Sequence, residues 1–328
     1  MIGFSDIIGQ ELIIGTLKRM AVTGKVPHAL IFDGEKGMGK ETLAGIFAAA
    51  LLCEDLKEGE PCMMCHSCVM AASGSHPDIL TVTHEKPGSI GVNEIRSQVV
   101  EDVVVKPYYG GRKIYIIPDA CLMTAEAQNA LLKTLEEPPE YAVIILLTDN
   151  KELLLPTLLS RSVSLYMRPV PDRALEGFLS KRAEGLAGDQ APVISFARGN
   201  PGKALLLSES EDFGDFYASM KGFLTSVRDM GVSDISKEAG EAAKIKEDRD
   251  DRLNFLLLWF RDILFLKAGG DPERLIFPEE ERFIREASEY YSFERLNDIT
   301  EAIKEASSMM DSNVNPEYTF EMLFMKMR

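Results

Sequence analysis

Residues Gly34-Glu35-Lys36-Gly37-Met38-Gly39-Lys40 decide the fold of this chain. They follow the apolar run Leu30-Ile31-Phe32 and precede a segment of helical character. Their spacing matches the first seven positions of the phosphate-loop pattern G-x-x-x-x-G-K-[ST]. In such a loop, backbone N–H groups surround phosphate oxygens and the positive end of the following helix adds to the attraction. Lys40 would reach the β- and γ-phosphates, so the stretch predicts a strand, a phosphate loop and a helix in succession.

The loop lacks the residue that would bind Mg²⁺. After the lysine this pattern requires Ser or Thr, whose hydroxyl holds the ion, and the chain has Glu41 instead. Thr42 lies one residue later, roughly 100° further round a helix, and we expect it to point away from the metal.

The second half of the metal site is also altered. It should follow an apolar strand as Asp-Glu, and the run at residues 114–117 is followed by Pro118 and Asp119. Proline therefore replaces the metal-binding Asp, and Asp119 replaces the water-activating Glu. Two changes that remove the same ion indicate a loop that keeps its fold without catalysis. Binding of ATP or ADP without hydrolysis, through Lys40 and the loop N–H groups, stays open.

Five short runs rich in Ile, Val and Leu alternate with helix-length segments in the first half of the chain. This pattern predicts an α/β domain with a parallel five-stranded sheet that is covered on both faces. The expected strands are residues 30–32, 79–82, 114–117, 143–147 and 163–167.

Helical patterns fill the remainder. Residues 127–135 have helical spacing, with Thr124 as the predicted N-cap and Pro138-Pro139 beyond the end. Pro169 and Pro171 suggest a domain boundary. We expect domains at residues 1–168, 169–207 (small and helical) and 208–328 (all-α). The acidic residues 208–215 are interpreted as a linker or solvated face, and the apolar residues 253–267, which include Trp259, as a helix.

Composition limits the function classes. The chain is 45% hydrophobic and 27% charged, as in globular proteins, and its formal net charge is −16. A protein that binds nucleic acid alone usually has a basic surface, so DNA contact would depend largely on partners. The N-terminus has no signal-peptide pattern, and the apolar residues 44–53 are too few to cross a bilayer. We expect a cytoplasmic protein without a membrane segment.

Four of the five cysteines lie between residues 53 and 68, with the spacing C-x8-C-x2-C-x2-C. Reduced cysteines clustered in this way indicate a closed, structural Zn²⁺ site. Free thiols and an iron–sulfur cluster are the alternatives, although the ferredoxin continuation C-x3-C-P is absent. We expect His66 at the surface and Cys121 in the core. The predicted ligands are Cys53, Cys62, Cys65 and Cys68.

A phosphate loop followed by this cysteine spacing resembles the zinc-bearing subunits of the bacterial DNA polymerase III clamp loader, gamma/tau and delta-prime. These are AAA+ proteins, and the resemblance is strongest over residues 1–205. Other segments similar to family motifs are residues 4–10, 28–30, 76–78, 91–96, 129–139 and 160–162. The loss of both magnesium contacts favours the delta-prime type. So does Gly202, which stands where the family's second sensor has arginine.

The resemblance implies roles for individual residues. Arg161, within Ser160-Arg161-Ser162, would be an arginine finger that acts on a neighbouring subunit's nucleotide. The degenerate nucleotide site would comprise Gly34, Gly37, Gly39, Lys40, Glu41, Thr42, Asp119 and Thr148.

The resemblance also implies partners. The chain would join gamma/tau and delta subunits in a five-membered ring that loads the sliding clamp onto primer–template DNA, within the DNA polymerase III holoenzyme. The second domain would be a lid and the third a collar. The chain alone would have no ATPase activity. The alternatives are an active gamma/tau-type motor and a zinc-dependent protein that binds nucleic acid by itself.

Overall fold

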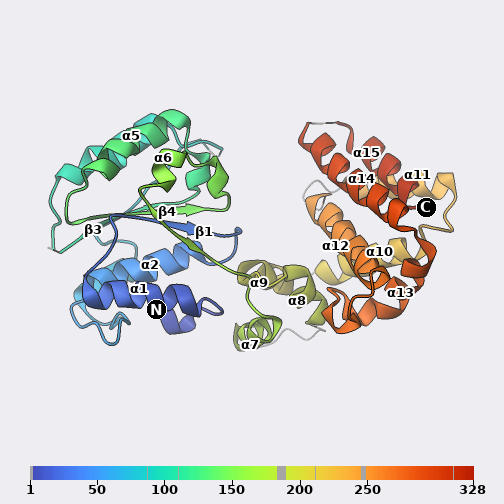
Figure 1. Ribbon diagram of the computed structural model, residues 1–328, viewed down its shortest axis with the longest axis horizontal. Coiled ribbons are helices and arrows are strands. Elements are labelled where there is room, and N and C mark those ends of the chain that lie inside the picture. The colour runs from blue at the N-terminus through green and yellow to red at the C-terminus, as the bar shows by residue number, and fades with distance from the viewer. Residues whose placement is uncertain are drawn as a thin grey trace. The chain divides into compact units, whose positions relative to one another are not determined.

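The computed structural model describes residues 3–86, 88–109, 111–182, 190–210, 212–244, 249–312 and 314–328. The chain divides into two compact units (Figure 1). The first comprises Met1–Arg182 and Gly199–Leu205, and the second comprises Ala183–Arg198 and Leu206–Arg328. Residues 183–189, part of the expected lid, lie outside the described residues, and the three-domain division stays a prediction.

The first unit contains a parallel five-stranded sheet with the order β2-β3-β4-β1-β5. Each predicted strand is present, with ends that differ by at most one residue. The inner strands β1, β3 and β4 are buried along their whole length, as expected of continuous apolar runs in a parallel sheet. The strands are β1 (Ala29–Asp33), β2 (Ile79–Thr81), β3 (Lys113–Ile117), β4 (Ala142–Thr148) and β5 (Val163–Tyr166).

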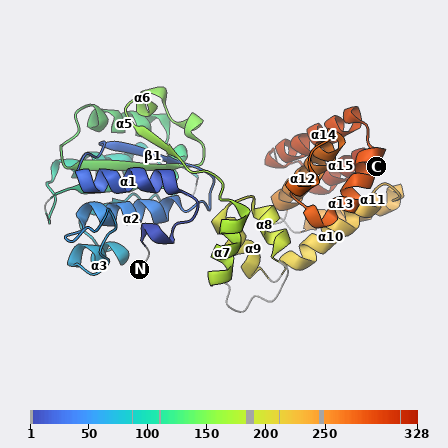
Figure 2. The ribbon, with the colours of Figure 1, turned by 60° about the horizontal axis from the view of Figure 1, so that its bottom comes forward.

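Helices cover both faces of the sheet, which confirms the predicted α/β architecture (Figure 1). Because successive strand side chains point to opposite faces, Ile31 packs on one face and Phe32 on the other. The Ile31 face is covered by α4 (Val92–Ile95), α5 (Ala125–Glu136) and α6 (Pro156–Leu159). The Phe32 face is covered by α1 (Glu11–Thr23) and α2 (Lys40–Leu52), and α3 (His66–Ala72) packs beside α2 (Figure 2).

Local signals account for the ends of two helices. The Thr124 hydroxyl accepts a hydrogen bond of 3.2 Å from the Ala127 N–H, so Thr124 is the predicted N-cap of α5. The helix ends at Glu136, two residues before Pro138. The apolar residues 44–53 form most of the buried helix α2, which ends at Leu52.

The second unit is helical. Phe255 and Trp259 of α12 (Arg249–Lys267) are buried and pack on Phe277, with ring centroids 5.0 and 5.7 Å from that of Phe277. Trp259 is therefore a core residue of its own unit. The other long helices are α8 (Ala191–Ala197), α10 (Phe213–Ser226), α11 (Val232–Lys244), α13 (Glu281–Tyr290), α14 (Phe293–Asp311) and α15 (Pro316–Met327).

Residues 208–215 do not form one linker, whereas the alternative of a solvated face agrees with the exposure of Glu209, Ser210, Asp212 and Asp215. Ser208 and Glu209 end α9 (Pro201–Glu209), and α10 begins at Phe213. Phe213 is buried against Phe196, with ring centroids 5.8 Å apart, and this packing outweighs the acidic composition around it.

Among the described residues, no helix combines the length and apolarity needed to cross a membrane.

The remaining elements are one longer helix and several short ones. The remaining longer helix is α7 (Asp172–Arg182), and the short ones are η1 (Phe4–Asp6), η2 (Arg96–Val100, a π-helix), η3 (Asp102–Val104), η4 (Ala120–Leu122), η5 (Lys151–Leu153), η6 (Pro272–Arg274) and η7 (Pro278–Glu280).

A buried carboxylate fixes one connection of the helical unit. Asp262 of α12 is fully buried, and its Oδ2 accepts hydrogen bonds from the N–H groups of Ile276 (2.7 Å) and Phe277 (2.9 Å). Arg261 Nη1 donates to Oδ1 at 2.5 Å. Burial raises the pKa of Asp262, and the hydrogen bonds from Phe277 and Arg261 oppose that rise. The carboxylate thus holds the segment before η7 against α12.

We expect Asp262→Ala to destabilise the helical unit by about 2–4 kcal/mol, because two buried N–H groups lose their acceptor. Guanidinium unfolding followed by Trp259 fluorescence measures this, since Trp259 lies on the same helix. Asp262→Asn keeps one acceptor and should lose less. Asp250→Ala, at an exposed position of α12, is the control. Equal unfolding midpoints for Asp262→Ala and Asp250→Ala would contradict the assignment.

Candidate functional site

The predicted phosphate loop connects β1 to α2. Gly37 and Gly39 have φ angles of +92° and +83°, a region that favours glycine because it lacks a Cβ. The Gly34 N–H donates to the Thr148 carbonyl of β4 at 3.1 Å, which fixes the start of the loop. Lys40 then begins α2. The local structure is the strand, loop and helix that the motif predicts.

The lysine of the loop is already bound by the loop itself. Lys40 Nζ donates to the carbonyls of Gly34 (2.6 Å) and Glu35 (3.0 Å). Burial lowers the pKa of Lys40, and the nearby carboxylates of Asp149, Asp119 and Asp33 oppose the effect. Three carboxylates around one ammonium group weaken its attraction for a polyphosphate.

Two of these carboxylates were not predicted as site residues. Asp33 ends β1 and Asp149 directly follows β4, so both lie at the carboxyl ends of parallel strands. Ligands of open α/β sheets bind at that edge. An acidic residue immediately after an apolar run was the available signal. Asp33, 6% exposed, also faces Lys151, with Nζ and Oδ2 3.6 Å apart.

The other residues predicted for the nucleotide and magnesium site differ in their exposure and contacts. Glu41 and Thr42 are exposed on the first turn of α2. Asp119 is exposed in a left-handed conformation with φ +46°. Thr148 is fully buried, and its hydroxyl accepts from the Asn150 N–H at 3.1 Å. The predicted residues thus lie around the phosphate loop, and Glu41 and Pro118 occupy the positions where Ser or Thr and Asp were expected to bind Mg²⁺.

The prediction that Cys121 belongs to the core is wrong. It is half-exposed, with Sγ 3.1 Å from Asp149 Oδ1. The buried position of η4 is taken by its neighbour Ala120. Burial and the hydrogen bond to Asp149 raise the pKa of the Cys121 thiol.

The turn before α9 closes against the phosphate loop. Asn200, 3% exposed, donates to the Lys36 carbonyl at 2.8 Å, and the Gly202 N–H donates to the Gly37 carbonyl at 2.9 Å. A Cβ at Gly202 would lie 2.6 Å from that carbonyl oxygen. The position where the family has arginine therefore has no room for a side chain while this contact persists.

A small cavity remains beside this turn. Its volume is about 200 Å³, and Ile7, Thr42, Phe178 and Arg182 contribute to its walls. Pockets for small ligands usually measure roughly 300–1,000 Å³, so the cavity is small for a nucleotide.

Arg161 lies elsewhere on the first unit, in the turn after α6. Its side chain is 37% exposed. Nη1 donates to the Thr157 carbonyl (3.1 Å) and to the Ser160 hydroxyl (3.3 Å), and Nη2 pairs with Glu136 Oε1 at 3.0 Å. The guanidinium is therefore held on the surface by α5 and α6.

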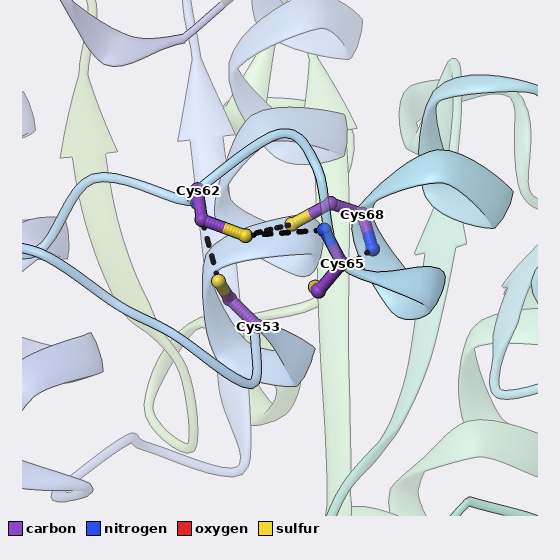
Figure 3. Close-up of side chains that lie close together, drawn as sticks. All are labelled: Cys53, Cys62, Cys65 and Cys68. Atoms are coloured by element: carbon purple, nitrogen blue, oxygen red, sulfur yellow. Dashed lines mark hydrogen bonds between the residues drawn. The ribbon is translucent and has the colours of Figure 1, made fainter.

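The four clustered cysteines converge on one point (Figure 3). Their sulfur atoms all lie within 4.8 Å of one another, and those of Cys62 and Cys68 are 4.0 Å apart. Backbone N–H groups donate to three sulfurs: Cys62 to Cys53 (3.2 Å), Cys65 to Cys62 (3.3 Å) and Cys68 to Cys65 (3.4 Å). Met63, with φ +59°, provides the tight turn between Cys62 and Cys65.

This sulfur cluster could hold a metal ion. Tetrahedral Zn²⁺ with Zn–S bonds of about 2.3 Å places sulfurs about 3.8 Å apart. Hydrogen bonds from the N–H groups of Met64 and Cys65 lower the pKa of Cys62 to about 6, which favours the thiolate that binds metal. Burial raises the pKa of Cys53 and Cys68, a cost that a cation would offset. His66 is exposed and contacts Tyr109 (3.4 Å between Nε2 and the hydroxyl), as expected of a surface residue.

Comparison with known proteins places these features in a family. Residues 9–171 match the family model described as DNA polymerase III, delta subunit. Residues 236–327 match the one described as DNA polymerase III, delta subunit, C terminal. Together the two matches cover most of the chain.

Curated relatives agree. DNA polymerase III subunit delta' of Bacillus subtilis is 28% identical over 309 residues, covering 93% of this chain and 92% of the relative. Subunit tau of the same organism is 30% identical over 346 residues, covering 98% of this chain but only 61% of the relative. Subunit delta' of Escherichia coli is 34% identical over 191 residues, or 58% of this chain and 57% of the relative. The chain is a member of the DNA polymerase III clamp-loader family.

Proposed function

We propose that this chain is a delta-prime-type clamp-loader subunit that does not hydrolyse ATP and that completes a neighbouring subunit's ATPase site with Arg161. One contrast carries the proposal. The chain has Glu41, after the phosphate loop, and Pro118, after β3, at the two positions expected to bind magnesium, whereas Arg161 stays exposed on the turn after α6.

Absence of hydrolysis follows from charge. Phosphoryl transfer needs positive charge that is placed in advance around the γ-phosphate, mainly from Mg²⁺ and lysine. Here Lys40 binds loop carbonyls and faces three carboxylates. Any ATP or ADP would be bound without turnover, in a cavity narrowed by the contact between Gly202 and Gly37.

Arg161 would act in trans. An arginine finger stabilises negative charge on the phosphoryl group in the transition state and is worth roughly 10³–10⁵ in kcat where it has been removed. Its guanidinium is always charged and presents several donors to phosphate oxygens.

The proposed assembly is a five-membered ring with gamma/tau and delta subunits, in which residues 169–207 form a lid and residues 208–328 a collar. Loading of the sliding clamp onto primer–template DNA would take place in the cytoplasm. With a net charge of −16, most phosphate contacts would come from the partners. Zn²⁺ at the four cysteines would have a structural role, because four thiolates leave no open position.

An active gamma/tau-type motor is the second candidate, and the 30% identity to a tau subunit favours it. The magnesium positions oppose it. ATP hydrolysis by the purified chain with Mg²⁺ separates the two, because only a motor hydrolyses ATP alone.

For Arg161→Ala we expect the DNA- and clamp-stimulated ATPase of the assembled complex to fall at least about tenfold, because the neighbour's transition state loses a cation. The chain alone should show no activity above background before or after the substitution. Arg19→Ala, at an exposed position of α1, is the matched control and should change nothing. Unchanged ATPase in an intact Arg161→Ala complex would rule out the finger role.

For the metal we expect about one Zn²⁺ per purified chain, bound by four thiolates. Cys62→Ser should reduce the content to near zero and lower the midpoint of thermal unfolding, because the N–H groups that face its sulfur no longer organise a metal ligand. Cys121→Ser, outside the cluster, should retain the metal. Elemental analysis and a colorimetric chelator give the content. A full zinc complement in Cys62→Ser, or iron in place of zinc, would refute the assignment.

A further inference from the structure

We infer that Glu136 is a positioning residue for Arg161, one that orients the guanidinium for a neighbouring subunit's phosphate. The inference rests on the proposed finger role of Arg161. The observation behind it is an ion pair between elements far apart in sequence. Glu136 Oε1, at the last residue of α5, lies 3.0 Å from Arg161 Nη2, in the turn after α6.

Both partners stand on fixed backbone. Leu135, next to Glu136, is 2% exposed, and Leu158, in the last turn before Arg161, is fully buried. The two leucines belong to the same hydrophobic cluster, on the face of the sheet that α5 and α6 cover, and these two helices are in contact. A charged pair mounted on packed elements keeps its geometry better than one on mobile loops. The core therefore fixes the backbone positions from which the two charged side chains extend.

The contacts leave part of the guanidinium available. Arginine has five N–H donors in a planar fork. In the described part of the chain, Nη1 donates hydrogen bonds to the Thr157 carbonyl and the Ser160 hydroxyl, and Nη2 forms the ion pair with Glu136. The remaining donors of the fork, including the N–H on Nε, can bind a phosphate without releasing these contacts. Two hydrogen bonds and one ion pair thus orient the guanidinium while one edge stays open.

The exposure of the pair limits the size of the effect. The side chains of Arg161 and Glu136 are 37% and 52% exposed, so water and salt weaken their attraction. Such a pair adds little to folding stability. Its contribution is to restrict the guanidinium to few orientations before the phosphate arrives. The arginine then loses less conformational entropy when it binds the phosphate.

The opposite effect is also physically available. A carboxylate beside the finger repels the incoming phosphate and competes with it for the guanidinium. Removal of Glu136 would then speed the neighbour's reaction. The sign of the change therefore decides between positioning and competition.

The test uses the complete complex with clamp and primed DNA. We expect Glu136→Ala to lower kcat for ATP roughly two- to fivefold, the range that an exposed ion pair supports, without change in KM or assembly. Glu136→Gln keeps an oxygen acceptor and should retain more activity than Glu136→Ala. Glu137→Gln is the matched control, because Glu137 is exposed and forms no ion pair with any described residue.

A double-mutant cycle completes the test. If Glu136 acts through Arg161, the variant with both alanines should be no slower than Arg161→Ala alone. An additive loss, an unchanged kcat or a faster Glu136→Ala complex would each overturn the positioning role. These results are informative only if Arg161→Ala itself is slow. A fully active Arg161→Ala complex would instead refute the proposed function, so the two failures are distinguishable.

Discussion

The pairing of β1 with strands on both sides is the constraint on which the rest of the first unit depends. At its carboxyl end, the Gly34 N–H donates to Thr148 of β4, and the Asp33 carbonyl accepts from Met167, just after β5. The chain therefore leaves the sheet at one fixed point and direction. The phosphate loop, the start of α2 at Lys40 and, at the other end of that helix, Cys53 of the sulfur cluster all follow from it.

The glycines of the loop have a structural use that does not require a nucleotide. Gly37 accepts the Gly202 N–H through its carbonyl, and a Cβ on Gly37 would lie 2.6 Å from Asn200 Oδ1. The loop and the turn before α9 thus pack backbone against backbone. Packing alone therefore requires glycine at positions 37 and 202, whether or not a nucleotide binds, because a larger residue at either position would push the two segments apart.

Local features were predictable from the sequence, and features that depend on strand order were not. The strands could be located within one residue because each is a short apolar run between turn residues, and the cysteine cluster because its spacing is local. The carboxylates of Asp33 and Asp149 surround Lys40 only because β1 and β4 are neighbours in the sheet. The same limit applies to Glu136 and Arg161, and to Phe213, whose acidic surroundings concealed its packing on Phe196.

The two charged sites of the first unit have opposite characters. The carboxylates near Lys40 disfavour a polyphosphate, whereas the turn after α6 exposes a cation whose carboxylate partner among the described residues, Glu136, is itself half in solvent. On the proposed function, such a chain supplies positive charge to a neighbour and needs none in return. Its sites then make it a one-directional member of a ring. The carboxylates near each cation account for this difference. Asp33 and Asp149, near Lys40, lie at the carboxyl ends of β1 and β4, whereas Glu136 leaves one edge of the Arg161 guanidinium open.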